Sequence, residues 1–367
     1  MKKILLAEVI VLLILVVFAV VIRVGNALPP ENDDGGISME QPTEAPTGDP
    51  TQGPTETDPP TEPPTEPPTQ PPTEPPTEPS TEPPTQEPTR PPEPESPGIP
   101  VPPGVTVSAE RYFVYNLQEA RFLAISCHED AALYPASITK LFSAYLALQY
   151  LDPETVITAG DELDLVNKGS SLAYIKKGHR LTVDMLVEAM MLPSGNDAAY
   201  ILAAAAGRAA SGEADMSAEE AVSYFVKLMN TVAKRVGMTG SNFRNPDGFH
   251  VGDHYTTCHD LTIVARLALN NEVISRHVST VKDDVRFESG QTIEWKNTNA
   301  LINPSSKYYC PNAIGLKTGS TGAAGNCLLS AFKENDGKIY IIGVFNCEEG
   351  NDRFVDTQHL YWGLICE

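Results

Sequence analysis

A four-residue repeat near the N-terminus most restricts what this chain can fold into. Threonine recurs at every fourth position from Thr57 to Thr89, and the repeating unit is Thr-Glu-Pro-Pro with small variations. The unit lacks large apolar side chains and is rich in proline, so residues 28–104 cannot build a core and favour polyproline II. We therefore predict a disordered linker at 28–104, which could extend to on the order of 200 Å at about 3.1 Å per residue.

The segment before the linker has the composition of a membrane anchor. Residues 1–27 begin with two lysines and continue as an apolar run at 4–22 that only Glu8 interrupts. A run of this length can span a bilayer and exceeds the usual core of a cleaved signal peptide. The lysines predict that the N-terminus lies inside the cell and everything after the span outside. Small residues at 25–27 leave a cleaved signal peptide, and hence secretion, as the alternative.

Residues 105–367 have the composition of a globular domain large enough to bury its own core. The net charge of −22 is concentrated in the linker, and the domain has no basic stripe, so we expect no nucleic-acid partner. Strand-like patterns come first and last, with helical patterns between them, which predicts an α+β fold in which helices flank an antiparallel sheet. Helices are expected from Ser137 to about 150, and at 182–191, 198–210, 218–236, 257–270 and 352–364.

A serine and a lysine three positions apart stand directly before the first apolar helix. Ser137 lies where a helix begins, and Lys140 follows on the same helix face, so hydroxyl and amine can meet. A desolvated lysine can take the proton of a serine and make it a nucleophile. Two other Ser-x-x-Lys pairs, at 279–282 and 330–333, fall in strand-like or connecting segments, where such positions face opposite sides. The simpler interpretation of Ser137 is an ordinary helix cap.

Two further motifs follow in the chain. Ser194-Gly195-Asn196 is the only Ser-x-Asn, and Lys317-Thr318-Gly319 is the only Lys-Thr-Gly. Alone, the first could be a helix-end turn and the second a surface lysine beside a bulge. In this order, the three motifs resemble the serine penicillin-recognising enzymes, and above all the low-molecular-mass penicillin-binding proteins, which are serine D-alanyl-D-alanine carboxypeptidases. The resemblance covers about residues 105–360 and implies a β-lactamase/transpeptidase-like fold.

The resemblance implies a catalytic role for four side chains. Ser137 would attack the D-Ala–D-Ala carbonyl and form an acyl-enzyme, and Lys140 would accept its proton. For that the pKa of Lys140 must fall, through burial and the charge of Lys317. Ser194 would relay a proton to the leaving amine. Asn196 would fix Lys140 and hold the substrate amide.

The resemblance also implies a substrate-binding strand. Lys317 and Thr318 would bind the terminal carboxylate, and Gly319 would let the substrate backbone approach. The backbone N–H groups of Ser137 and Ser320 would form the oxyanion hole. The expected partners are peptidoglycan stem peptides, with β-lactams as inhibitors, and we expect no metal and no other cofactor.

Two other functions stay open at this point. A class A-like β-lactamase would need a glutamate to activate water; the middle residue of Ser194-Gly195-Asn196 is not the usual Asp, and the loop at 245–250 carries no Glu. A surface protein that binds peptidoglycan or β-lactams without turnover would not need the complete set of motif side chains.

Histidines and cysteines allow two further alternatives. His250, His254 and His259, with Asp253 and Cys258, could suggest zinc, but their spacing does not match a His-Glu-x-x-His helix. Cysteines at 327 and 347 lie nearly opposite across a predicted hairpin, so we expect a disulfide there, with free thiols as the alternative.

Overall fold

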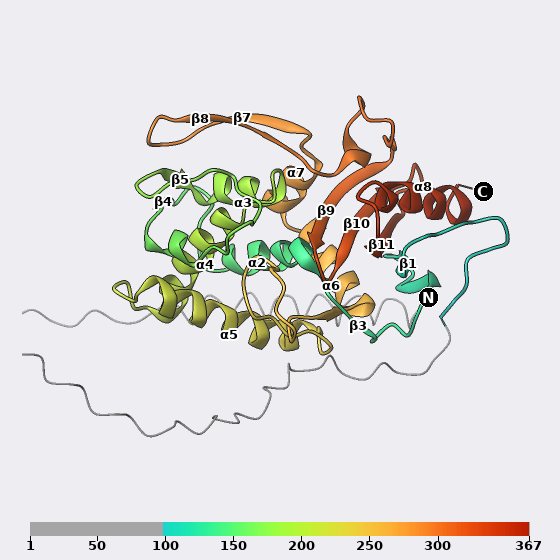
Figure 1. The fold of residues 1–367 in the computed structure, drawn as a ribbon, viewed down its shortest axis with the longest axis horizontal. Coiled ribbons are helices and arrows are strands. Elements are labelled where there is room, and N and C mark those ends of the chain that lie inside the picture. The colour runs from blue at the N-terminus through green and yellow to red at the C-terminus, as the bar shows by residue number, and fades with distance from the viewer. Residues whose placement is uncertain (1–97, 367) are drawn as a thin grey trace, which may run out of the picture. The chain divides into compact units, whose positions relative to one another are not determined.

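The computed structural model describes residues 98–366, so the predicted membrane segment and most of the predicted linker lie outside the described residues. A five-stranded sheet with the strand order β2-β1-β11-β10-β9 organises this part of the chain (Figure 1). All its neighbours are antiparallel. The strands are β1 Arg111–Asn116, β2 Arg121–Ile125, β9 Ala313–Thr321, β10 Gly325–Lys333 and β11 Ile339–Cys347. The predicted α+β class is confirmed.

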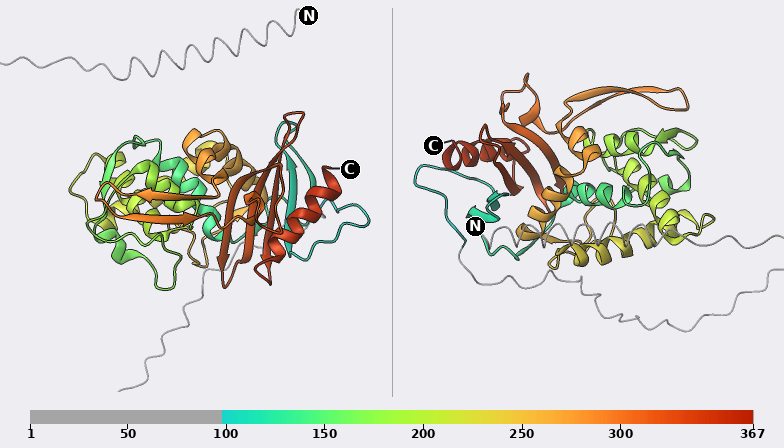
Figure 2. Two further views of the ribbon diagram at one scale, coloured as in Figure 1. Left: turned by 90° about the horizontal axis from the view of Figure 1, so that it is seen from above. Right: turned by 180° about the vertical axis from the view of Figure 1, so that it is seen from behind.

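The two faces of the sheet pack into two separate cores because side chains alternate along each strand. On one face, Leu328 and Val344 pack against α8, which spans Asp352–Leu364 and lies along the sheet in Figure 2. On the other face, Leu329 and Phe345 join the large core that the remaining helices share. The sheet therefore separates the C-terminal helix from the helical part of the molecule.

The helical part lies beyond the β9 edge of the sheet and carries two small hairpins (Figure 1). Its helices are α2 Thr139–Ala147, α3 Val183–Met191, α4 Asn196–Ser211, α5 Ala218–Val236, α6 Cys258–Leu269 and α7 Glu272–Ser279. The hairpins pair β4 Val156–Thr158 with β5 Arg180–Thr182, and β7 Lys282–Arg286 with β8 Thr292–Lys296. A short bridge joins β3 Ala132–Leu133 to β6 Thr256–Thr257. Single 3-10 turns lie at η1 Ala136–Ile138, η2 Asp161–Leu165 and η3 Ala300–Ile302.

Small side chains let α4 pack closely against its neighbour. A Cβ at Gly207 would lie only 2.2 Å from the main-chain oxygen of Ala221 in α5. The alanine-rich sequence of α4 therefore serves close helix packing rather than helix propensity alone. The first turn of α4 is also buried, and Asn196 and Asp197 lie there.

Some predicted element boundaries agree with the structure. The helix expected at 182–191 begins at Val183, and Thr182 Oγ1 accepts a hydrogen bond from Met185 N at 3.1 Å, which makes Thr182 its cap. The last helix is found at the predicted bounds. Helix α7 was not predicted, and Ser279 is its last residue rather than part of a strand-like or connecting segment.

Two local expectations about the first helix and the linker need correction. Ser137 does not cap α2: it lies in the 3-10 turn η1, and Ile138 stands at the N-cap with no side-chain cap bond. The chain also contacts the domain before residue 105, because Ile99 forms a bridge with Ile125. Apolar residues between the prolines at 98–104 account for this, since Val101 packs against the core beneath α8.

The expected disulfide between Cys327 and Cys347 is absent, and all six cysteines of the chain are free. The register of the hairpin explains this, because Asn326 rather than Cys327 pairs with Cys347 and a bulge follows. Cys327 therefore lies in the large core, whereas Cys347 lies in the core beneath α8.

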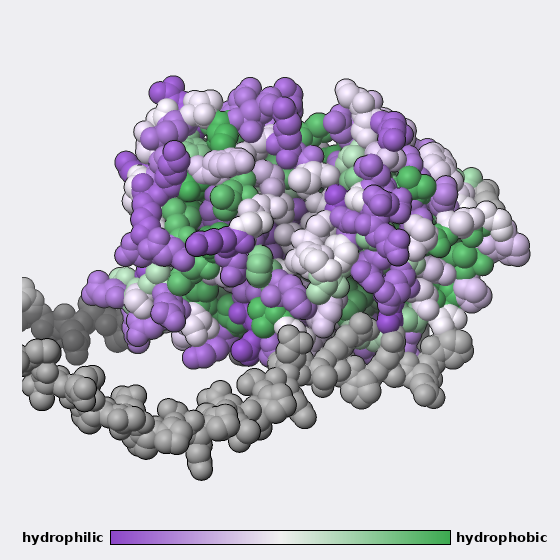
Figure 3. All heavy atoms as spheres, viewed as in Figure 1, coloured by the Kyte–Doolittle hydropathy of each residue, from purple (hydrophilic) through white to green (hydrophobic). Residues whose placement is uncertain are grey.

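Polar residues cover much of the visible face, with apolar residues in separate groups between them (Figure 3). Among residues 98–366, no helix is both long and apolar enough to cross a membrane.

Candidate active site

The nucleophile candidate and its proton acceptor meet at the start of α2. Lys140 Nζ donates a hydrogen bond of 2.8 Å to Ser137 Oγ. Lys140 is fully buried, whereas Ser137 is partly exposed. The turn that carries Ser137 is strained, because Ala136 has a φ of +47°. The hydroxyl therefore faces accessible space while the amine behind it is shielded from water.

Burial and nearby charges act in opposite directions on the pKa of Lys140. Burial lowers its pKa to about 8, and the negative charges of Asp247 and Asp197 oppose this shift only in part. The amine also donates to the main-chain oxygen of Asp247 at 2.8 Å. Lys317, expected to push this pKa down, is not among the groups that change it. A lysine with this pKa is neutral often enough near neutral pH to accept a proton.

The Ser-x-Asn motif lies between α3 and α4, with Asn196 as the first residue of α4. Ser194 is buried with a φ of +64°, and its hydroxyl makes no hydrogen bond within the described part of the chain. Asn196 Nδ2 donates to the Asp247 carboxylate in a short hydrogen bond. Asn196 Oδ1 is buried and has no partner among the described residues. The proton relay assigned to Ser194 thus stays a prediction. The side-chain oxygen of Asn196 can accept a further hydrogen bond.

The Lys-Thr-Gly motif lies on the edge strand β9, against the nucleophile turn. A Cβ at Gly319 would lie 3.0 Å from Pro135 O and 3.1 Å from Ser137 N, so a larger residue would push the nucleophile turn away by a few tenths of an ångström. Lys317 is fully buried, and its Nζ donates to Thr318 O at 3.2 Å. Burial, followed by the charges of Lys140 and Arg353, holds the pKa of Lys317 well below its ordinary value.

Hydroxyl groups extend the polar edge of β9. Thr318 Oγ1 lies 2.5 Å from Thr298 Oγ1. Ser320 is exposed, and its hydroxyl donates to Gly319 O at 2.7 Å. The backbone of Ser320 stands beside the turn of Ser137, since Gly319 contacts that turn directly.

Two charged residues at this site were not predicted. Arg353 reaches from α8, and its Nη1 donates to Gly319 O at 3.2 Å and to Ser320 Oγ at 3.0 Å. Its Nε is buried and has no partner among the described residues. Asp247 comes from the loop at 245–250, which the sequence analysis considered only for its lack of a glutamate. No local pattern marks Arg353, because its position depends on how α8 crosses the sheet.

A cavity of about 260 Å3 lies at this site, and its lining includes Ser137, Asn196 and Ser320. Its other walls are short segments at 169–171, 248–250 and 320–322. None of these lining residues is an Asp or a Glu. The cavity therefore brings a serine nucleophile next to a polar strand edge and offers no carboxylate to activate a water molecule.

The histidines that suggested zinc do not converge. His254 Nε2 lies 3.0 Å from Thr139 Oγ1, and burial lowers the pKa of His254 to about 3. His250 packs edge-on against Tyr134. His259 Nδ1 lies 3.3 Å from a carboxylate oxygen of Asp260. Across residues 98–366, no group of three or more His, Cys, Asp or Glu side chains is arranged to hold a metal ion.

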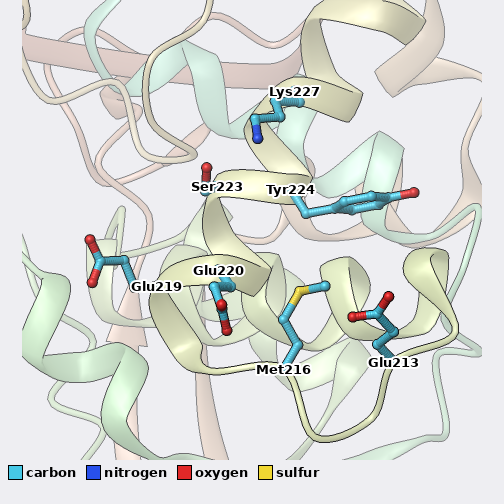
Figure 4. A pocket seen from close by; sticks show the side chains of 7 residues that line it. All are labelled: Glu213, Met216, Glu219, Glu220, Ser223, Tyr224 and Lys227. Carbon is cyan, nitrogen blue, oxygen red and sulfur yellow. The ribbon is translucent and has the colours of Figure 1, made fainter.

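A larger hollow lies on the surface beside α5 and contains none of the motif residues (Figure 4). Its volume is about 410 Å3. The residues around it are Glu213, Met216, Glu219, Glu220, Ser223, Tyr224 and Lys227. Glu220 already forms the capping box of α5 with Ser217. Size alone therefore does not identify the functional site.

Comparisons with known proteins point to one family. A family model described as D-alanyl-D-alanine carboxypeptidase, peptidase S11, matches residues 97–348. The D-alanyl-D-alanine carboxypeptidase DacF of Bacillus subtilis is 31% identical over 230 residues, which cover 62% of this chain and 54% of DacF. A D-alanyl-D-alanine carboxypeptidase of Streptomyces sp. strain K15 is 34% identical over 211 residues, covering 55% of this chain and 69% of that protein. The chain thus matches about half of the length of DacF.

Solved structures agree with the fold. The crystal structure of the Streptomyces K15 DD-transpeptidase matches with a TM-score of 0.64 and 28% identity, over 71% of this chain and 98% of that one. Penicillin-binding protein D2 of Listeria monocytogenes, in an ampicillin-bound form, matches with a TM-score of 0.57 and 26% identity, over 71% and 99%. The expected β-lactamase/transpeptidase-like fold is confirmed.

Proposed function

The chain belongs to the D-alanyl-D-alanine carboxypeptidase family of serine peptidases, and from this premise we propose that it removes the terminal D-Ala from peptidoglycan stem pentapeptides through an acyl-enzyme. The observation that carries the proposal is the 2.8 Å hydrogen bond between Lys140 Nζ and Ser137 Oγ, made by a lysine whose pKa burial lowers to about 8. A neutral amine at this distance can take the serine proton.

In the acylation step, Ser137 Oγ forms a bond to the carbonyl carbon of the D-Ala–D-Ala amide while Lys140 takes the hydroxyl proton. The negative charge on the carbonyl oxygen is stabilised by the backbone N–H groups of Ser137 and Ser320. The proton then passes from Lys140, through Ser194, to the amide nitrogen. The C–N bond breaks and D-Ala leaves.

In the deacylation step, water attacks the ester carbon of the acyl-enzyme. Lys140 takes a proton from that water, and the Ser137 oxygen recovers one as the ester bond breaks. The shortened peptide leaves with a new carboxylate, and both residues return to their first state.

The polar edge of β9 beside the cavity suits a peptide with a free C-terminus. Lys317 and Thr318 would bind the terminal carboxylate, and Arg353, anchored on Gly319 and Ser320, would add a second positive charge. A bound carboxylate would raise the depressed pKa of Lys317 again, so substrate would bind together with a proton.

Penicillin should acylate the same serine. Penicillin-binding protein D2, a structural relative, has been solved with ampicillin bound. The absence of Asp and Glu from the cavity lining at 169–171, 248–250 and 320–322 supports slow release of the penicilloyl group. This favours a penicillin-inhibited peptidase over a β-lactamase.

The enzyme would act outside the cell. The apolar run at 4–22 and the lysines before it support an anchor with the N-terminus inside, and the repeats at 28–104 support a long tether. Fractionation of cells with a C-terminally tagged chain tests this: protein in the membrane and open to added protease supports the anchor. Tagged protein in the medium, shortened by the N-terminal segment, supports cleavage and secretion, and protease-resistant cytoplasmic protein contradicts both.

Release of D-Ala from a diacetyl-Lys-D-Ala-D-Ala peptide by the purified full-length chain tests the activity. We expect release by the natural protein, loss in Ser137→Ala, and no change in the matched control Ser279→Ala, which alters the serine of another Ser-x-x-Lys pair. Rapid penicillin hydrolysis without D-Ala release would instead indicate a β-lactamase. Binding of labelled penicillin or peptidoglycan with neither reaction would indicate a non-catalytic surface protein.

A further inference from the structure

Asp247 is a fully buried carboxylate that touches two of the proposed catalytic residues, and the mechanism above gives it no task. Its main-chain oxygen accepts from Lys140 Nζ at 2.8 Å. Its carboxylate accepts a hydrogen bond from Asn196 Nδ2, and another from Phe249 N at 3.1 Å. One residue thus connects the first helix, α2, with the start of α4.

The loop that carries Asp247 is fixed against the nucleophile turn. A Cβ at Gly248 would lie 1.8 Å from Ala136 O, and Gly248 has a φ of +82°, so glycine is required for this contact. Ser143 Oγ of α2 donates to Pro246 O at 2.7 Å. Gly248 N donates to Asn245 Oδ1 at 2.8 Å, which closes the loop on itself. The position of Asp247 beside Lys140 is therefore built into the fold.

Other charged groups around Lys140 come from three further elements. Asp197 of α4 adds a second carboxylate beside Lys140. Lys140 in turn lowers the pKa of Lys317 of β9, as does Arg353 of α8, and Tyr200 of α4 has its pKa raised by burial and by Asp247. Asp197 accepts hydrogen bonds from three backbone N–H groups, those of Ala173, Ile175 and Ala198. Asp247 accepts from Phe249 N, its own N–H and the Asn196 amide; burial raises its pKa, and the charge of Lys140 opposes that rise and favours the carboxylate.

We propose that Asp247 is a positioning residue for Lys140 and Asn196, and that its negative charge stabilises the ammonium which Lys140 becomes on taking the Ser137 proton. This inference rests on the proposed function. Lys140 is fully buried, so each proton it takes adds a positive charge to a region shielded from water, where that charge is costly. Asp247 supplies the opposite charge within that region.

The same carboxylate fixes the orientation of Asn196. A carboxylate can only accept, so it holds the Nδ2 end of the amide. The unpartnered Asn196 Oδ1 is then left to accept from the Lys140 ammonium or from the substrate amide. An uncharged side chain at 247 that can donate would permit the amide to turn around.

Asp247→Asn tests the charge with little change of shape, while the main-chain contact to Lys140 stays. Burial lowers the pKa of Lys140 and Asp247 opposes this, so removing the charge lets that pKa fall further below about 8. We expect the acidic limb of kcat/KM for D-Ala release to move down by about one pH unit. The plateau rate should fall about tenfold, because one unit of pKa corresponds to that factor in stabilising the ammonium.

Two control variants test whether the shift of the acidic limb depends on the charge at position 247. Asp247→Glu keeps the charge and should keep the acidic limb at its natural pH even if its rate is lower. Asp260→Asn removes another buried carboxylate, which accepts from Gly240 N and Ser241 Oγ and has no part in the pKa of Lys140. It should not move the limb. Asp247→Ser provides a second charge-free variant if Asp247→Asn fails to fold.

A folded Asp247→Asn variant with an unmoved acidic limb would overturn the inference. Lysine ε-13C NMR titration of Lys140, assigned with Lys140→Met, gives the same comparison without turnover. If the natural protein neither releases D-Ala nor reacts with penicillin, the proposed function fails. The titration then decides the role of Asp247 separately: a lower pKa in the variant supports it, and an equal pKa refutes it.

Discussion

Two fully buried lysines stand beside the same cavity, and their neighbours suit them to different tasks. Lys140, on the helical side, has the carboxylates of Asp247 and Asp197 nearby, and its pKa falls only to about 8. Lys317, on the strand β9, is near Lys140 and Arg353, and its pKa is held well below its ordinary value. Lys140 can exchange a proton near neutral pH. For Lys317, an incoming anion would instead stabilise the charged form. Identical side chains are thus divided between proton transfer and carboxylate binding by the charges around them.

The largest expected effect comes from Lys140→Met. Acylation of Ser137 by fluorescent penicillin should fall by a factor of about 10²–10⁴, the usual worth of a general base. Lys140→Arg should be equally impaired, since an arginine keeps its proton. Stopped-flow labelling measures both. An active Lys140→Arg would show that the charge, rather than proton transfer, is what the site needs.

Lys317→Met should have a smaller and different effect. Hydrogen bonds to charged groups contribute about 1.5–3 kcal/mol, so kcat/KM for a free C-terminal carboxylate should fall roughly tenfold to a hundredfold. A substrate whose terminal D-Ala is an amide lacks that charge and serves as the control. Steady-state kinetics on both substrates make the comparison. An equal loss of kcat/KM on both substrates would indicate that Lys317 acts in proton transfer. It would then contradict the separate roles assigned to Lys140 and Lys317.

Arg353→Gln should weaken binding of the substrate carboxylate at the edge of β9. We expect KM to rise up to about tenfold with kcat nearly unchanged, because the side chain would act on the bound carboxylate rather than on the reacting bond. Arg276→Gln, which removes an exposed partner of Asp184, is the control. A fall in kcat alone would assign Arg353 to the chemical step instead.

The pH dependence separates the two lysines without any substitution. Only neutral Lys140 accepts a proton, so acylation should rise with pH through about 8 and then level off. Binding of the carboxylate needs Lys317 charged, so KM should rise as pH increases. Rates and KM measured across the same pH range check both signs. An acylation rate that falls through pH 8 would contradict the assignment of Lys140 as base.

The sequence predicts the contacts that depend on near neighbours. The meeting of Ser137 and Lys140 follows from a spacing of three at a helix start, and β1 and β2 follow from their apolar alternation. The Ser-x-Asn and Lys-Thr-Gly motifs were brought to the same site only by family resemblance, because no local rule links segments so far apart in the chain.

Features that depend on long-range packing were missed or predicted wrongly. Arg353 reaches the site because α8 crosses the sheet, and Asp247 because its loop docks against Ala136 at Gly248, and neither arrangement leaves a local pattern. The simpler interpretation of Ser137, a cap of α2, is wrong, because the close contact with Gly319 accompanies a 3-10 turn at that point. The Cys327 bridge failed because a bulge shifts the hairpin register.

The account depends most on Ser137 as the acylated residue, and mapping the adduct tests this directly. The purified full-length chain would be treated with penicillin, digested, and analysed by mass spectrometry beside Ser137→Ala. We predict one covalent adduct per chain, on the peptide that contains Ser137, and none in the variant. An adduct on any other residue, or an unmodified natural chain, would contradict the account.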